Sequence, residues 1–129
     1  MEELVLDDLT ARLERVGPAT LSLAFSGRSA SRDPGKVLAP VFARALEAAR
    51  TDGVVLALHF EGLEYFNSST IAALLQFVRG AQEAGVPLEI VYDARQRWQA
   101  LSFDALRRAL RPLEAPGSGP TLRFLESQG

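Results

Sequence analysis

The chain has 129 residues, of which 47% are hydrophobic, and this fits one compact domain with a buried core rather than a disordered segment. Its 14 Lys and Arg residues face 16 Asp and Glu residues, so the net charge of -2 gives no reason to expect nucleic acid or an anionic membrane as a partner. The chain has no cysteine and one histidine, which excludes disulfides and cysteine-based zinc sites. The acidic amino terminus does not resemble a signal peptide, and no segment is long enough for membrane insertion, so we expect a cytoplasmic protein.

Two strands are predicted first along the chain. Apolar and polar residues alternate over Leu9–Arg15 and again over Ala19–Phe25, a pattern typical of half-exposed strands. The Gly17-Pro18 turn between them predicts a hairpin, and we expect the first strand at an edge of the sheet. Residues 26–33 are small and polar, which predicts a loop.

A helix is predicted next. Asp33 is a suitable N-cap, Pro34 suits the first helical position, and apolar residues then recur at helical spacing. Pro40 interrupts the pattern, so the helix is either kinked there or regular only from about Ala39. The Thr51-Asp52-Gly53 segment ends it.

The central strand and the second helix form the main unit of the sequence. Val54–Phe60 is apolar on both faces except for His59, which predicts a strand buried in the middle of the sheet. We expect His59 to be a hydrogen-bonded core residue. A short polar turn over 61–66 leads to a helix over Ser68–Ala84, with Gly85 as its C-cap.

The remaining elements complete an α/β pattern. They are a strand over 86–92, a helical region over 95–110 that breaks near 102–104, a loop over 111–120 and a strand over 121–125. The order predicts one mixed sheet, with an antiparallel first hairpin and later parallel strands, and helices packed on it. The third helical region is basic, which predicts a solvated face, with a partner or anionic-lipid site as the alternative.

A polar cluster, Asn67–Thr70, lies where the central strand ends and the second helix begins. Ligands of open α/β sheets gather at such places, and the free N–H groups of the helix start favour negative charge. A phosphoryl group on Ser68 would be accommodated there. The alternative is plain helix capping, for which Asn and Ser are favoured residues. The sequence has no Gly-x-Ser-x-Gly motif and no Walker phosphate loop, so we predict neither an enzyme nor a bound cofactor.

These elements and motifs together resemble the STAS domains, whose simplest members are the bacterial anti-sigma-factor antagonists. The resemblance covers roughly Leu9 to Leu125 of a single domain over residues 1–129, with 126–129 as a tail. The segments that carry it are Leu21–Arg28, Val54–Phe60 with Gly62-Leu63, Phe66–Thr70 and Gly85–Leu88.

The resemblance implies a non-enzymatic partner-switching protein in signal transduction and transcription regulation. Its partners would be a GHKL-type serine kinase that is also an anti-sigma factor and a PP2C-type phosphatase, and ATP and Mg²⁺ would belong to the kinase. By position, the phosphate acceptor would be Ser68, with Ser69 and Thr70 as fallback acceptors. The residues expected to bind the partner are Asn67, Ser68, Ser69, Thr70, Tyr65, Phe66, Ile71 and Arg28.

Two residues depart from the usual STAS pattern. Asn67 stands where an Asp is usual, and Thr70 stands where a Gly is usual. These departures make the surroundings of Ser68 less negative and favour an alternative function. In that alternative the chain is a STAS-like subunit without a phosphorylation cycle, in a phospholipid transport complex or a signalling scaffold.

Overall fold

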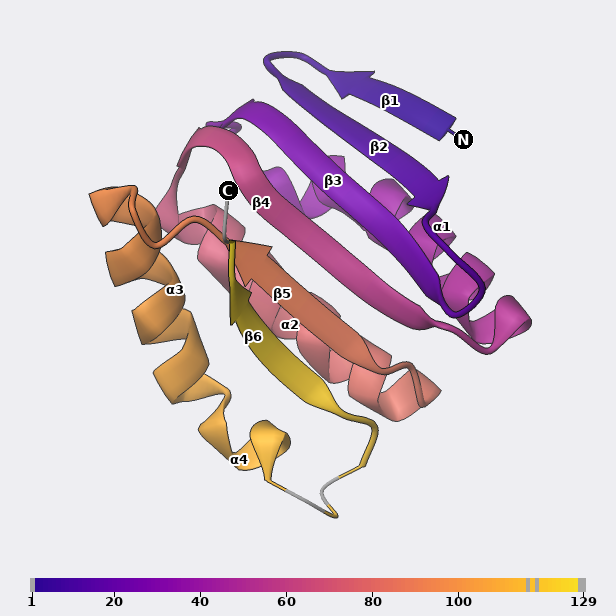
Figure 1. Ribbon diagram of the computed structural model, residues 1–129. Coiled ribbons are helices and arrows are strands. Elements are labelled where there is room, and N and C mark those ends of the chain that lie inside the picture. Colours follow the sequence, from indigo (N-terminus) through magenta and orange to yellow (C-terminus); the bar gives the residue numbers. More distant parts are fainter. Residues whose placement is uncertain (1, 116, 118, 128–129) are drawn as a thin grey trace.

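Six strands form one sheet, and they lie side by side in the order of the chain (Figure 1). The computed structural model describes residues 2–115, 117 and 119–127. The elements are β1 (Glu2–Leu6), β2 (Leu9–Arg15), β3 (Thr20–Ser29), α1 (Pro34–Asp52), β4 (Val55–Phe66), α2 (Ser68–Ala84), β5 (Leu88–Tyr92), α3 (Arg97–Ala109), α4 (Arg111–Glu114) and β6 (Leu122–Glu126).

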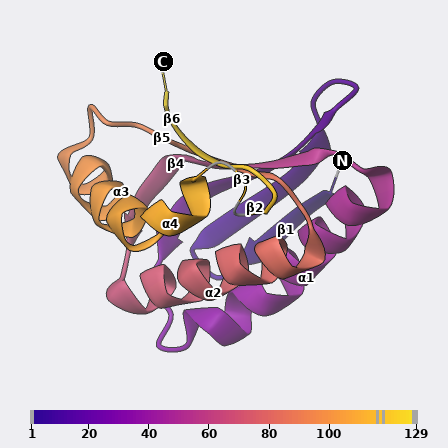
Figure 2. The ribbon, with the colours of Figure 1, turned by 90° about the horizontal axis from the view of Figure 1, so that it is seen from below.

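The sheet is mixed, as predicted. Strands β1, β2 and β3 are antiparallel neighbours, whereas β3, β4, β5 and β6 run parallel to one another. Figure 2 shows the helices gathered on one face of the sheet. The opposite face carries no helix from the described part of the chain.

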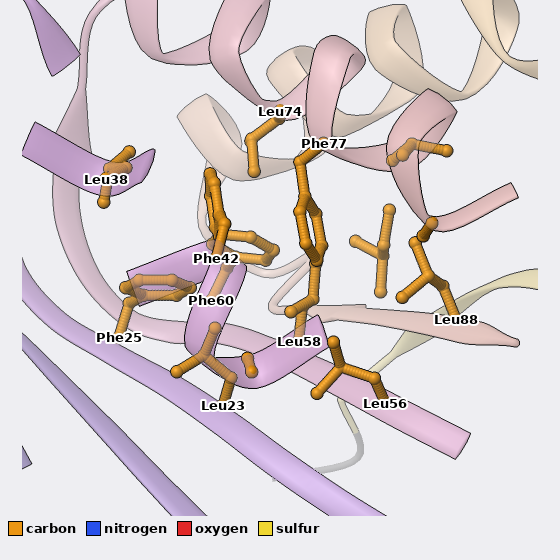
Figure 3. Packing of buried hydrophobic residues seen from close by; sticks show 14 of the residues in the cluster. Leu23, Phe25, Leu38, Phe42, Leu56, Leu58, Phe60, Leu74, Phe77 and Leu88 are labelled. Carbon is orange, nitrogen blue, oxygen red and sulfur yellow. The ribbon is translucent and has the colours of Figure 1, made fainter. Parts of the chain in front are cut away.

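The core lies between the sheet and the helices α1 and α2 (Figure 3). Alternate residues of the central strands point to this side because successive side chains of a strand face opposite ways. Phe25 of β3 stacks on Phe60 of β4 with ring centroids 5.3 Å apart, and Phe42 of α1 stacks on Phe77 of α2 at 4.3 Å. Burying each such side chain contributes about 1.5–3 kcal/mol, so this layer holds the helices to the sheet.

The two long helices begin and end as predicted. The Asp33 side chain accepts a hydrogen bond from the Lys36 N–H at the start of α1, and Gly53 ends the helix in the left-handed conformation. Gly85 ends α2 in the same way. The helix α1 is continuous through Pro40, so it does not begin at Ala39.

The structure corrects the prediction that Leu9–Arg15 lies at a sheet edge. The strand β1 pairs with β2 along its whole length and takes the edge position itself. Asp7 makes the tight turn between them with a positive φ of 57°, a conformation that Asp tolerates better than most residues. The strand β1 was not predicted because it is short and mostly exposed. Its Glu2 pairs with Arg44 on α1.

The central strands are longer than predicted. Residues 26–29 belong to β3 rather than to a loop, and residues 61–66 belong to β4 rather than to a turn. Irregular pairing near Ser26 and Arg28 leaves extra residues on β4, which bends the strand there. Polar residues and glycine at this bend resemble a turn in sequence, which explains the error.

The carboxyl-terminal third also differs from the prediction. The helix α3 runs without a break through residues 102–104, and the predicted loop over 111–120 begins with the short helix α4. The predicted closing strand is confirmed as β6. The predicted tail lies partly outside the described residues, and Glu126 belongs to β6. None of the helices in the described residues combines the length and the apolar character of a membrane span.

Candidate functional site

The candidate site is the junction between β4 and α2, where the predicted polar cluster lies. The strand β4 ends at Phe66, Asn67 is the N-cap of α2, and Ser68 is the first residue of the helix. The junction packs against the end of β3, because the Asn67 N–H donates to the Ser29 carbonyl at 3.1 Å. Two strand ends therefore fix where the helix begins.

Asn67 uses both ends of its side-chain amide. Its Oδ1 accepts from the Thr70 N–H at 3.0 Å and from the Thr70 hydroxyl at 2.8 Å. Its Nδ2 donates to the Ser31 carbonyl at 2.9 Å. An aspartate would keep the first two contacts but has no N–H for the third.

Thr70 and Ser29 complete this network in the interior. Their hydroxyl oxygens are 2.9 Å apart, and the side chains are 3% and 5% exposed, respectively. Because the Thr70 proton is used toward Asn67, the Ser29 hydroxyl is the donor to Thr70. The two departures from the STAS pattern, Asn67 and Thr70, are thus partners in one network, which we name the junction network (Ser29, Ser31, Asn67 and Thr70).

Ser68 and Ser69 lie outside the junction network. Both residues are exposed on the first turn of α2. Within the described part of the chain, neither hydroxyl has a hydrogen-bond partner, because Asn67 does the capping. The first turn contains no acidic residue, so the free N–H groups and the helix dipole leave this end positive.

The other residues predicted to bind the partner differ in how exposed they are. Tyr65 is 39% exposed, and the Arg28 guanidinium lies over its ring, 5.0 Å from the centroid. Ile71 is half-buried. Phe66 is buried and packs edge-on against Trp98 at 5.2 Å, so it belongs to the core rather than to an exposed apolar rim.

His59 lies on the sheet face that the helices leave uncovered. Its Nδ1 is 3.1 Å from a carboxylate oxygen of Glu61, so the predicted hydrogen bond exists, but the ring is only half-buried. The hydrogen bond to Glu61 raises the pKa of His59, against the opposing effect of burial. Burial raises the pKa of Glu61, whereas the hydrogen bond with His59 lowers it. The pKa of Glu61 stays below its ordinary value.

Sequence reasoning missed the residues that hold the site in place. Ser29 and Ser31 fell in the predicted loop, and their partners are 36 to 41 positions away in the chain. Gln99 is fully buried and donates to the carbonyl groups of Phe60 and Leu63 in the bent part of β4. The one sequence feature that pointed to this role of Gln99 was the position of a glutamine on the apolar face of the predicted helix.

The described residues contain no group of three or more His, Cys, Asp or Glu side chains that would hold a metal ion. The junction itself presents two exposed hydroxyl groups at a positive helix start.

No protein-family model and no curated protein sequence matches the chain. Solved structures do match. An anti-sigma factor antagonist from Mycobacterium paratuberculosis is 16% identical, covers 81% of this chain and 85% of its own, and has a TM-score of 0.56. The chain has a STAS-like fold. SiaC of Pseudomonas aeruginosa is 17% identical over 98% of this chain and 100% of its own, with a TM-score of 0.57.

A third similar structure with this STAS-like fold is the Bacillus cell fate determinant SpoIIAA in its phosphorylated form. It is 14% identical, covers 92% of this chain and 91% of its own, and has a TM-score of 0.54. At such identities the similarity is one of fold. It confirms the STAS-like α/β fold that the order of elements and the Phe66–Thr70 segment predict.

Proposed function

We propose that this chain is a non-enzymatic interaction module of the partner-switching kind, controlled by phosphorylation of Ser68. Its partners would be a serine kinase of the GHKL type that also acts as an anti-sigma factor, and a PP2C-type phosphatase that removes the phosphate. The neighbours in fold support this proposal, because they include anti-sigma-factor antagonists and a phosphorylated form of SpoIIAA.

The observation that carries the proposal is that Ser68 is exposed and not used for capping. Asn67 caps the helix, so the Ser68 hydroxyl is not needed for capping. Thr70 is buried in the junction network, so Ser68 and Ser69 are the acceptors that a kinase can reach. We place the phosphate on Ser68 and keep Ser69 as the fallback.

The junction is electrostatically suited to a phosphate. A phosphoserine adds about -1.5 to -2 charge at neutral pH, and an anion at a helix start is stabilised. The change alters the surface that a partner meets without breaking the junction network beneath it. A reversible switch of partners follows from such a change.

The test is incubation of the full chain with its cognate kinase and ATP, followed by mass spectrometry of the peptides. We expect one phosphate on Ser68, lost in Ser68→Ala and retained in Ser69→Ala. Ser26→Ala, which removes an exposed serine from β3, is the matched control. A chain that stays unmodified at Ser68, Ser69 and Thr70 would exclude the phosphorylation switch.

A constitutive STAS-like subunit is the second candidate function. The junction network favours it, because Asn67 and Thr70 fix the helix start with neutral groups. Co-purification from the source organism separates the two candidates. A transporter ATPase as the stable partner would support the subunit of a phospholipid transport complex, whereas a kinase would support the switch.

A further inference from the structure

A surface groove lies between α1 and α2, on the side of these helices that faces away from the sheet. Figure 2 shows the two helices running next to each other. The stacked rings of Phe42 and Phe77 lie at the bottom of the groove, which has a volume of about 230 Å³. Ala39, Ala43 and Gly80 line its sides, so the walls are low and apolar.

The groove continues to the candidate phosphorylation site. A second hollow of about 270 Å³ shares Gly35, Ala73 and Gln76 with the first and reaches Ser69. From Ser69 to Gly80 the helix α2 rises about 16 Å, or three helical turns. The groove is therefore long enough for a short helix laid along it.

The end of the groove next to the serines is positively charged. Arg32 lines it and Lys36 lies on the first turn of α1, and neither side chain forms an ion pair in the described part of the chain. Both helices also begin at this end, α1 at Pro34 and α2 at Ser68, and neither has an acidic residue in its first turn. Asp33 also lines this end, and its carboxylate caps α1 by accepting from the Lys36 N–H, so Arg32, Lys36 and the two helix starts outweigh its one negative charge.

We infer that the groove between α1 and α2 is the docking surface for an acidic amphipathic helix of the partner protein, an inference that rests on the proposed function. The apolar face of the partner helix packs on the exposed Ala39 and Ala43 and on the ring edges beneath them, in the helix-in-groove mode of recognition. Its carboxylates lie at the end of the groove that Arg32 lines, next to Lys36 on the first turn of α1, where the opposite charges attract.

This arrangement explains how a phosphate on Ser68 would change partners. The phosphate would bring a dianion to the end of the groove where the acidic helix docks. The phosphate and the carboxylates then repel each other and compete for Arg32 and Lys36. Release of the partner needs no movement of the fold.

The experiment measures the Kd between the full chain and the purified kinase that phosphorylates it. The test variants are Arg32→Glu combined with Lys36→Glu, which reverses the charge of the groove end, and Ala43→Trp, which fills the groove. The matched controls on α3 and α4 are Arg97→Glu with Arg111→Glu, and Ala105→Trp, all at exposed positions. Circular dichroism checks that each variant keeps its helix content.

We expect both groove variants to weaken binding at least tenfold and both controls to change it less than twofold. Hydrogen–deuterium exchange on the kinase should then show one protected helical segment with more Asp and Glu than Lys and Arg. Equal effects of groove and control variants would overturn the inference. So would a protected segment that is basic or not helical, or a groove that turns out to bind a second copy of this chain.

The outcomes separate this inference from the proposed function. If the kinase phosphorylates Ser68 and the groove variants bind as the controls do, the groove assignment fails and the proposed function stands. If the chain retains no kinase from a lysate of its source organism and takes up no phosphate, both fail.

Discussion

At the scale of single residues, Asn67 is the most informative position, because its amide joins α2 to the segment that follows β3. We expect Asn67→Asp to keep the helix cap, to lose the donor to the Ser31 carbonyl, and to set a carboxylate against that oxygen. The free energy of unfolding should fall by no more than about 1 kcal/mol, because the lost hydrogen bond joins two half-buried groups and the helix start attracts the added charge. Urea denaturation of the two proteins measures it.

Asn67→Ser is the companion variant, because it also loses the donor but adds no charge. The difference between the two variants reports the net effect of the carboxylate, which the Ser31 carbonyl repels and the helix start attracts. An Asn67→Asp protein with an unchanged urea midpoint would show that the junction network does not depend on this amide.

His59 makes a second residue-scale prediction, which concerns pH. Its hydrogen bond to Glu61 raises its pKa above the ordinary value of 6.5, so the folded protein binds the proton more tightly than the unfolded chain does. The stabilisation is complete below that ordinary value and is lost as the pH rises through the raised pKa, so stability should fall as the pH rises above 6.5.

His59 is the one histidine of the chain, so an NMR titration of the imidazole signals gives its pKa without ambiguity. We expect a midpoint above 6.5 in the wild type and a lower one in Glu61→Gln, with the fall in stability absent from His59→Gln. A Glu61→Gln midpoint equal to that of the wild type would show that Glu61 does not stabilise the charged ring.

At the scale of elements, α3 is joined to the bent part of β4 by Gln99. This fully buried side chain donates to the Phe60 carbonyl at 2.8 Å and to the Leu63 carbonyl at 3.2 Å, and it accepts from the Asp93 N–H at 2.8 Å. Gln99→Leu leaves these three backbone groups without their partner. We expect it to lower the free energy of unfolding by about 2–4 kcal/mol, measured by urea denaturation.

The control for this prediction is the reverse exchange on the exposed side of the same helix. Leu101 is 64% exposed, so Leu101→Gln should change the free energy of unfolding by less than about 0.5 kcal/mol. A similar effect of the two variants would mean that Gln99 matters only for helix propensity.

The elements that could be predicted from the sequence are those whose signals are local. The helix α2 has its cap at Asn67, its apolar stripe and its terminating Gly85 within one stretch, and its predicted bounds are confirmed. The strand β1 has no such signal, because its place depends on pairing with β2. The ends of β3 and β4 likewise depend on pairing with each other across a bend.

The candidate site also has one part that could be predicted from local sequence and one part that could not. The exposed serines and the capping role of Asn67 follow from the order strand, polar cluster, helix. The partnership of Asn67 with Ser31, and of Thr70 with Ser29, joins segments far apart in the chain, and no local pattern encodes it. The burial of Phe66 depends on where α3 packs, since Trp98 covers it.

At the scale of the whole molecule, an added charge at Ser68 lies on the exposed start of α2, whereas the sheet and the buried residues beneath it hold the fold. The first turn of α2 has no acidic residue and is exposed, whereas the junction network beneath it is buried. A negative charge at Ser68 should therefore interact favourably with the helix dipole, stabilise α2 and leave the core unchanged. We expect Ser68→Glu to raise the free energy of unfolding by about 0.3–1 kcal/mol at low salt, and less at high salt.

Gln76→Glu is the matched variant, because it adds the same charge to an exposed site in the middle of α2, where the dipole has little effect. Amide hydrogen exchange should show unchanged protection of β3, β4 and β5 in both variants. If Ser68→Glu lost protection in these strands, the added charge would be disrupting the junction network. A phosphate at Ser68 would then act by loosening the fold rather than by changing the surface that a partner meets.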